Sequence, residues 1–351
     1  MRFTQEDFIA DYSFFRGHSI FEQVTEEEEF VWNKGESVDK VSPLVEEIFE
    51  IFSVSRISEC SQTPYLIHKS YPSARSFYLQ ECFICNGGNE FLYKNEVSDK
   101  YQVVYCQNND VSFEKGDILI KTGKMKYDLY KSIRKTLMLL ELGHIVYNIH
   151  LVLSKFDFKI NRIKMDTNYT LISLENGSVF TPALTLKALH QLYVLRTSGP
   201  YLKRIIDFNR QINAHYLFKT NIQEAFRCLF NVEYDSTIIR MYIFRNNGVD
   251  GFCYENITLS YSILNKVYQY IDFRSASQYT LFAIKREFHK IFEQYIVFLG
   301  YIAQECCLHN SCYGRYNRPV KQVLPVKVWE SFFADDCRQY YPFYGIITGN
   351  I

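Results

Sequence analysis

The sequence has no excess of charge of either sign, since 39 Lys and Arg residues balance 39 Asp and Glu residues over 351 positions. A strongly basic balance favours nucleic acid or an anionic membrane surface as a partner. Its absence removes the overall electrostatic argument for both, although a local basic patch is compatible with a neutral total. We therefore expect a protein that binds neither nucleic acid nor a membrane.

The sequence also lacks a run of about 18 apolar residues, the length that a membrane-spanning helix needs. Its first residues, MRFTQEDFIADYSFF, carry Glu6, Asp7 and Asp11 where a secretory signal peptide has an uninterrupted apolar core. Together these two absences predict a cytoplasmic protein.

A disulfide framework and a metal site are missing from the pattern as well. Ten cysteines in a cytoplasmic chain of this length are typical of reduced, buried side chains. Cys82 and Cys85 form a CxxC pair, but no second CxxC and no HxxxH accompany them. They lie in the strand-like run YLQECFIC, where residues three apart point to opposite faces. We interpret them as structural, and interpret Cys306, Cys307 and Cys312 in the same way.

What the sequence does contain is the composition of a folded globular protein, with 47% hydrophobic, 17% aromatic and 22% charged residues. Its length exceeds the usual size of one domain, so one large domain or two of about 150 to 175 residues are expected.

An internal repeat favours two units. LMLLELGHIVYNIHL (137–151) aligns with YIVFLGYIAQECCL (295–308) at a constant offset of 157 residues, which places Gly143 on Gly300. Both segments have apolar residues at helical spacing around the central glycine. Because glycine has no side chain to hold two backbones apart, we expect two long helices that approach closely at these positions.

A strand-turn-strand pattern precedes each of these helices. Residues 76–97 contain an Asn-Gly-Gly turn and residues 238–259 contain an Asn-Asn-Gly turn, both between strand-like runs. A helix-like segment stands before each hairpin, VSPLVEEIFEIF (41–52) in the first half and NIQEAFRCLF (221–230) in the second. Each half therefore repeats the order helix, hairpin and long helix.

We predict an α+β fold of two tandem units, each with an antiparallel or mixed sheet, flanking helices and a long central helix. Such a chain is a covalent version of a homodimer, or pseudo-dimer. The polar, turn-rich segment 165–185 is expected to join the units. The predicted division is an N-terminal extension (1–44), a first unit (45–170) and a second unit (186–351).

The order of short motifs resembles a known family. The first half carries YPSARSFYLQECFI (71–84), a hairpin, the pair Lys126-Tyr127 and then LELGHIVYNIHL (140–151). This order resembles the SagB/McbC-type azoline dehydrogenases of the FMN-dependent nitroreductase-like superfamily, which show a Pro-Ser-x-Gly-like segment, a Lys-Tyr pair and a Gly-His helix. In the second half, the resemblance rests on LRTSGPYL (195–202), GVDGFCYEN (248–256) and FLGYIAQECCL (298–308).

The resemblance covers most of residues 45–165 and 190–351, and it implies two tandem nitroreductase-like units. The sequence departs from the family pattern in two places. Arg75 stands where the family usually has glycine, and Ala283-Ile284 falls on Lys126-Tyr127 at the offset of 157. The second unit is therefore expected to be degenerate, without the Lys-Tyr pair.

By resemblance, the protein uses FMN to oxidise thiazoline or oxazoline rings in a ribosomally made precursor peptide to thiazoles or oxazoles. One ring carbon loses a proton while its neighbour passes a hydride to the flavin, so a base and the flavin must flank the ring. The resemblance implies Lys126 as the base and Tyr127 as its partner, which relays the proton or orients the amine. The residues alone are equally compatible with a solvated lysine at a helix start beside a core tyrosine.

The resembled fold holds its flavin between two protomers, so both halves of this chain should contact FMN. The expected cofactor residues are Ser73, Arg75, Arg196 and Ser198. Arginine matches a phosphate group with two parallel hydrogen bonds. Arg315, in the turn-rich segment YGRYNRP (313–319), is a further candidate, with a solvated basic loop as the alternative. The lack of a GxGxxG motif or a P-loop agrees with flavin held by scattered contacts.

Several alternatives stay open. His144 either points to the flavin or substrate, or is a hydrogen-bonded core histidine. The acidic run Glu26 to Glu29 is a solvated helix start or a docking site for a basic peptide. A complex with a cyclodehydratase or a leader-binding protein is expected from the resemblance, and self-association is compatible with it. Two other functions share the architecture: a general FMN-dependent reductase of quinones or nitroaromatics, and a flavin-free scaffold that binds a peptide or a partner enzyme.

Overall fold

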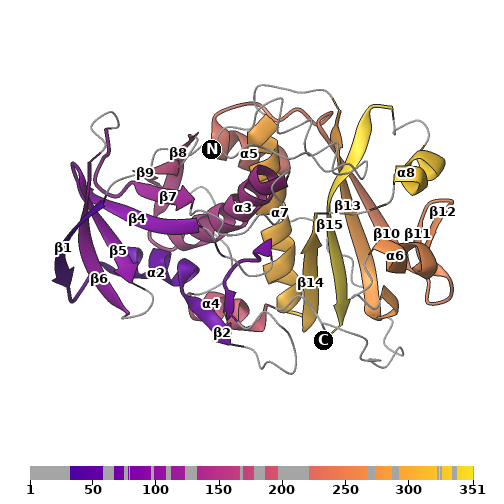
Figure 1. Cartoon of the computed structure of the whole chain (residues 1–351), viewed down its shortest axis with the longest axis horizontal. Helices are drawn as coiled ribbons and strands as arrows, with labels where there is room; N and C mark the ends of the chain where they lie inside the picture. Colours follow the sequence, from indigo (N-terminus) through magenta and orange to yellow (C-terminus); the bar gives the residue numbers. More distant parts are fainter. Residues whose placement is uncertain are drawn as a thin grey trace.

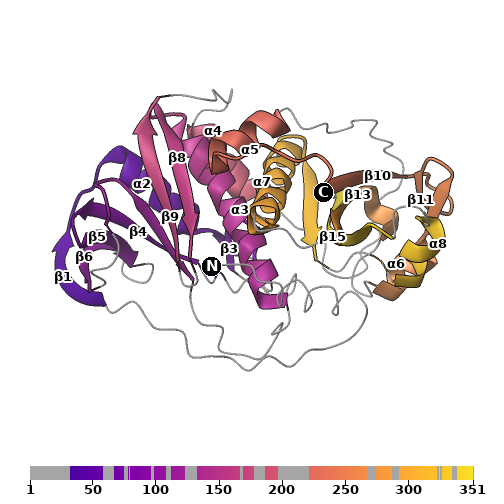
Figure 2. The ribbon, with the colours of Figure 1, turned by 90° about the horizontal axis from the view of Figure 1, so that it is seen from above.

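The two long helices, α3 (Arg134–Leu153) and α7 (Phe292–Ser311), lie side by side between two β-sheets at the two ends of the molecule (Figure 1). Seen from above, the same order of sheet, helix pair and sheet is evident (Figure 2). The computed structural model describes residues 32–57, 67–74, 78, 80–95, 99–107, 112–122, 133–166, 169–177, 186–196, 221–267, 273–286, 292–321, 324, 326–333 and 338–350.

The first sheet is entirely antiparallel. Its seven strands lie in the order β1 (Trp32–Val38), β6 (Lys100–Cys106), β5 (Glu90–Asn95), β4 (Gln80–Gly87), β7 (Ile118–Thr122), β9 (Tyr169–Asn176) and β8 (Phe158–Met165).

The second sheet is also antiparallel and repeats this order. Its six strands are β12 (Ile257–Ser260), β11 (Gly251–Tyr254), β10 (Ile239–Asn246), β13 (Ala276–Lys285), β15 (Tyr340–Asn350) and β14 (Arg315–Val320). Apart from the edge strand β1, each strand has a counterpart at the same place in the other sheet and in the same chain order. The predicted repeat and the α+β fold class are confirmed.

Both predicted hairpins form, and their turns have the backbone that their residues favour. Between β4 and β5, Gly87 and Gly88 have φ of +135° and +58°, a region in which residues with a Cβ are disfavoured. Between β10 and β11, the side-chain oxygen of Asn247 accepts the backbone N–H of Val249, Asp250 and Gly251 at 3.0–3.1 Å. This Asx-type turn satisfies backbone donors that the sheet does not use.

The shorter helices cover the sheets and the ends of the helix pair. They are α2 (Pro43–Phe52), α4 (Leu186–Leu195), α5 (Ile222–Phe230), α6 (Tyr261–Val267), the 3-10 turn η3 (Phe273–Ser275) and α8 (Val326–Phe332). A two-stranded ribbon of β2 (Val54–Ile57) and β3 (Ile67–Lys69) follows α2. Helix α2 begins at the N-cap Ser42 with proline in its first position, and α5 begins at the N-cap Asn221.

The two helix-like segments that precede the hairpins do not occupy equivalent places. Helix α2 packs against α3 and β4 of its own unit, whereas α5 packs against β8 of the first sheet. Helix α4 packs against α7 and β2, so it connects the second half to the ribbon of the first. Both segments are helical and stand in the predicted order, but they pack against different sheets.

The helix pair crosses at its two glycines, as predicted. A Cβ added to Gly143 would collide with the carbonyl oxygen of Val297 and would lie 2.8 Å from the Cα of Gly300. A Cβ added to Gly300 would collide with the carbonyl oxygen of Leu140 and would lie 3.1 Å from the Cα of Gly143. Only glycine at both positions allows this backbone contact.

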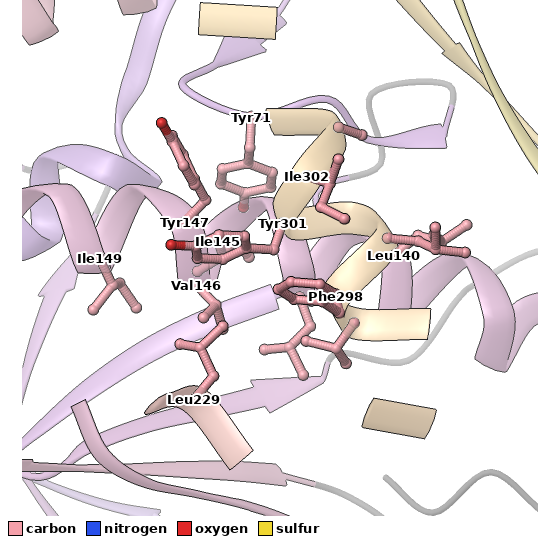
Figure 3. Packing of buried hydrophobic residues seen from close by; sticks show 14 of the residues in the cluster. Tyr71, Leu140, Ile145, Val146, Tyr147, Ile149, Leu229, Phe298, Tyr301 and Ile302 are labelled. Carbon is pink, nitrogen blue, oxygen red and sulfur yellow. The ribbon is translucent and has the colours of Figure 1, made fainter. Parts of the chain in front are cut away.

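Around this crossing lies the main hydrophobic core, which joins both sheets to both helices (Figure 3). Helix α3 is long and apolar enough to span a membrane, but its side chains are buried inside the protein from Met138 to Leu153. A helix that is apolar all round is typical of a core position in a large domain.

The first sheet extends beyond the predicted boundaries of its unit at both ends. Strand β1 lies in the expected N-terminal extension and pairs with β6, and β9 continues past residue 170 to Asn176. The CxxC cysteines are free, buried and on opposite faces, since Cys82 belongs to the main core and Cys85 to the cluster on the other face of the sheet. The interpretation of this pair as structural is confirmed.

Candidate functional site

Three of the seven predicted site residues lie in the described part of the chain: Ser73, Arg196 and Arg315. The proposed catalytic pair, Lys126 and Tyr127, lies outside the described residues, between the end of β7 and the start of α3. Arg75 and Ser198 also lie outside the described residues. Their assignments stay predictions.

Arg196 lies at the point where the second half meets the first. It follows α4, and its backbone N–H continues the helix by donating to the carbonyl of Leu192 at 2.8 Å. Its side chain is buried, and Nη2 donates to the carbonyl oxygens of Lys69 at 3.0 Å and Tyr71 at 3.3 Å. This arginine therefore holds the segment that follows β3, from across the boundary between the units.

Ser73 lies on the same segment. Its Oγ accepts the backbone N–H of Tyr78 at 2.9 Å, and the Tyr78 hydroxyl accepts the backbone N–H of Lys69 at 3.0 Å. Within the loop from 69 to 78, two side-chain hydrogen bonds thus link Tyr78 to Lys69 and Ser73, and Arg196 donates to the carbonyls of Lys69 and Tyr71. Ser73 therefore lies on the segment whose carbonyls at Lys69 and Tyr71 accept from Arg196, and the assignment of both residues to the cofactor stays a prediction.

Arg315 lies elsewhere, in strand β14 of the second sheet, opposite Asn350. It is buried, its guanidinium lies 5.9 Å from the ring centre of Tyr313, and burial lowers its pKa. The alternative of a solvated basic loop is wrong for this residue. Its assignment to the cofactor stays a prediction.

Sequence reasoning missed three cationic or titratable residues of the ribbon, Arg56, His68 and Lys69. Arg56 on β2 is paired with His68 on β3, and Lys69 is buried with its Nζ 5.5 Å from the ring centre of Tyr78. A signal was present in the sequence: Arg56-Ile57-Ser58 after α2 repeats the Arg-x-Ser pattern that Arg196 opens after α4.

The charges in this group act on one another. Burial lowers the pKa of His68 to about 4, with further lowering by the positive charges of Arg56 and Arg196. Burial, and then the charge of Arg196, also lowers the pKa of Arg56. Two guanidinium groups therefore lie close enough to repel each other. Among the described residues, no carboxylate forms an ion pair with either of them.

The Nε–H groups of Arg56 and Arg196 are both buried and have no hydrogen-bond partner among the described residues. A buried donor without a partner is destabilising, and one on a charged group more so. Two such donors on neighbouring guanidinium groups are what a bound anion would satisfy, because arginine pairs with phosphate or carboxylate through parallel hydrogen bonds. We call Arg56, Lys69 and Arg196, together with the neutral His68 beside them, the cationic group.

A buried polar network joins the loop to both long helices. Gln304 on α7 donates through Nε2 to the carbonyl oxygen of Ser70 at 2.9 Å and to Oδ1 of Asn148 at 3.0 Å. Asn148 on α3 donates through Nδ2 to Oγ of Ser70 at 2.9 Å, and the Ser70 hydroxyl donates to the carbonyl of Ile51 at 2.7 Å. Each unit thus contributes one amide side chain that holds Ser70.

His144 completes this network. Its Nδ1 lies 3.1 Å from Oε1 of Gln304 and its Nε2 lies 2.9 Å from the hydroxyl of Tyr344. Burial, followed by the charge of Arg196, lowers its pKa to about 3. Of the two roles considered for His144, the structure supports the core histidine with both nitrogens hydrogen-bonded.

Within the described residues, no group of three or more His, Cys, Asp or Glu side chains could hold a metal ion. The donor set of the site consists of arginine, lysine, serine and amide groups. That chemistry suits an oxyanion or a phosphate ester.

No protein-family model and no curated protein sequence matches the chain. A solved structure does match: a "putative nitroreductase" from Anabaena variabilis, with a TM-score of 0.61 and 11% sequence identity over 99% of this chain and 100% of that one. At this identity the likeness shows the fold alone. The chain has a mixed α+β architecture similar to the nitroreductase fold, with both of its sheets and its helix pair inside the matched length.

Proposed function

We propose that the protein is a cytoplasmic, FMN-dependent oxidoreductase, and more narrowly a dehydrogenase that converts thiazoline or oxazoline rings of a precursor peptide to thiazoles or oxazoles. The observation that carries the proposal is the pair of buried, unpartnered Nε–H groups of Arg56 and Arg196, one from each half. The similarity to a nitroreductase supports the same class of chemistry.

The residues present fit the phosphate of FMN. Arg56 and Arg196 would hold the phosphate oxygens, and their mutual repulsion would be relieved by the negative charge. Arg196 also holds the carbonyls of Lys69 and Tyr71, and Ser73 follows two residues later on the same segment. When bound, FMN supplies the hydride acceptor that the oxidation of a ring requires.

The position of Lys126 in the chain is compatible with its proposed role as base. Strand β7 ends at Thr122, whose hydroxyl donates to Oε1 of Gln80 at 3.1 Å. Gln80 begins β4, directly after the site loop. Lys126 follows the end of β7 by only four residues in the sequence.

Lys126 would remove the proton from one ring carbon, and Tyr127 would orient the amine. A lysine works as a base when burial or a neighbouring positive charge lowers its pKa. In this proposal, the positive charges of Arg56 and Arg196 would lower the pKa of Lys126.

The test begins with the absorbance of the purified protein. Bound flavin, released by denaturation and identified as FMN, supports the proposal, whereas a colourless protein that takes up no added FMN contradicts it and favours the flavin-free scaffold. A peptide with preformed azoline rings is then added, and mass spectrometry follows the loss of two hydrogens per ring. Rapid oxidation of NADPH with quinones, together with no change in the peptide, would favour the general reductase instead.

The peptide substrate implies further partners, which are part of the same proposal. A cyclodehydratase must form the azoline ring before it is oxidised, so we propose a complex with such an enzyme or with a leader-binding protein. Co-purification of the cyclised peptide with the dehydrogenase, with and without the cyclodehydratase, measures whether the complex is required.

A further inference from the structure

The contact between the two long helices is symmetric. Gly143 touches the backbone of α7 at Val297, and Gly300 touches the backbone of α3 at Leu140. The offset of 157 residues relates Gly143 to Gly300 and Leu140 to Val297, so each contact is the other with the two helices exchanged. This is the isologous pattern of a twofold dimer interface, built inside one chain.

A twofold relation creates two equivalent positions beside the crossing, and the residues there differ. At one position lie His144, Asn148 and Gln304. The same offset places Tyr301, Glu305 and Tyr147 at the other. The contact between His144 and Gln304 at the first position therefore corresponds to the contact between Tyr301 and Tyr147 at the second.

The first position is polar and adjoins positive charge. Gln304 and Asn148 hold Ser70, and Arg196 donates to the carbonyls on either side of it. The charge of Arg196 also reaches His144 and Cys307, lowering the pKa values of these two groups below what burial alone would give. An anion bound at the cationic group would therefore adjoin the hydrogen-bonded side chains of Gln304, Asn148 and Ser70.

The second position is filled by aromatic rings (Figure 3). The rings of Tyr147 and Tyr301 meet edge to face with centres 4.9 Å apart, and Phe298 stacks on Tyr301 at 5.7 Å. The Tyr301 hydroxyl lies 2.7 Å from Nδ1 of His150. Glu305 is buried there, and its negative charge adds to burial in raising the pKa values of Tyr147 and Tyr301.

The polar first position favours a bound anion, whereas the aromatic second position opposes one. Aromatic packing leaves the second position without the amide groups that hold a loop at the first, and a buried carboxylate repels a phosphate. We infer that the chain has one anion site, and hence one FMN, at the Gln304 position, and that the Tyr147 position is a closed part of the core. Gln304 of the second half is thus a positioning residue for a site whose arginines come from both halves.

This inference rests on the proposed function for the identity of the ligand, but its test does not. Isothermal titration of the full chain with inorganic phosphate and, separately, with FMN should give one site per chain for each. One phosphate site without FMN binding would refute the proposed cofactor and leave the single site in place. Two FMN sites per chain would overturn the inference of a single site but would agree with FMN as the cofactor. Binding of neither ligand would overturn both.

A matched pair of variants tests the role of Gln304. Gln304→Leu should raise the dissociation constants of phosphate and FMN by about tenfold or more, since the loop loses the hydrogen bond to the Ser70 carbonyl and Asn148, which also holds Ser70, loses its partner on α7. At saturating ligand its stoichiometry should still be one, which a partly unfolded protein would not reach. Tyr147→Leu, at the equivalent position, should leave both constants within about twofold. An equal loss of affinity in Tyr147→Leu would overturn the positioning role of Gln304. If either variant fails to fold, the number of sites measured in the wild-type protein still tests the single anion site.

Discussion

Nε2 of His144 lies 2.9 Å from the hydroxyl of Tyr344, across the boundary between α3 and the second sheet. Because Oε1 of Gln304 can only accept, Nδ1 of His144 carries the proton and Tyr344 donates to Nε2. The imidazole is therefore neutral and fixed in one tautomer, with a pKa of about 3. A histidine held in this way serves the interface between the halves rather than proton transfer.

Stability should fall as the pH is lowered from 7 to 5.5. The pKa values of His144 and His150 are lowered by burial from 6.5 to about 3 and about 4, so the unfolded chain takes up protons in this range while the folded chain does not. Each histidine should then cost about 1 kcal/mol of unfolding free energy over this interval. Urea unfolding at several pH values measures the slope, which should be shallower in His150→Phe. A flat profile in the wild type would contradict the assignment.

Gly143→Ala should destabilise the protein by more than the roughly 1 to 3 kcal/mol of ordinary overpacking, because its Cβ meets backbone rather than a movable side chain. Gly300→Ala should have a similar effect for the same reason. Gly248→Ala is the control, since its Cβ would have nothing within 4 Å and only its φ of +76° opposes the change. Its cost should be about 1 kcal/mol. Thermal unfolding that ranks the three variants otherwise would argue against a backbone contact.

Arg196→Ala should weaken FMN retention by about 10- to 150-fold, since a charge-assisted hydrogen bond is worth on the order of 1.5 to 3 kcal/mol. Arg56→Ala should act in the same direction, because the two side chains share the anion. The control is Arg162→Ala, an exposed residue on β8. Flavin released on denaturation, measured against protein concentration after gel filtration, reports the loss. Full retention in both variants would remove these arginines from the site.

Lys126→Ala should lower the rate of azoline oxidation by about 10²- to 10⁴-fold, the usual cost of losing a general base. Bound FMN and the midpoint of thermal unfolding should stay near their wild-type values. Lys124→Ala, two residues away, is the matched control and should keep its activity. Near-normal turnover in the Lys126 variant would exclude it as the base.

The pKa of His68 should report the anion directly. It is held at about 4 by burial and by the charges of Arg56 and Arg196, so a phosphate bound to these residues should raise it towards 6.5. An NMR titration of the imidazole with and without added phosphate measures the change. Potassium chloride at the same ionic strength is the control. Equal shifts with both salts would indicate screening rather than a site.

Much of the fold was predictable from local patterns. The helix pair carries its glycines at one offset, and the Asn-Gly-Gly and Asn-Asn-Gly turns specify their hairpins through backbone conformations that few other residues adopt. The place of α5 against the first sheet was not predictable in this way, because its apolar face fits any core surface.

The site was only partly predictable, for a related reason. Ser73 and Arg196 were predicted from the resemblance, whose motifs have a local order, and the structure places Ser73 on the segment to which Arg196 donates. Arg56 and His68 were missed, since they lie in a ribbon of seven residues in total that has no hydrophobic period. Their proximity to Arg196 depends on the packing of α4 on β2, which no short stretch of sequence encodes.

The crossing of α3 and α7 also determines how the protein responds to dilution. Two subunits that meet through such helices separate when their concentration falls below the dissociation constant. Here the same contact is intramolecular, and the connecting chain keeps the local concentration of one helix around the other high at any dilution. The proposed site, with Arg56 from one half and Arg196 from the other, would therefore stay assembled at the lowest abundance in a cell.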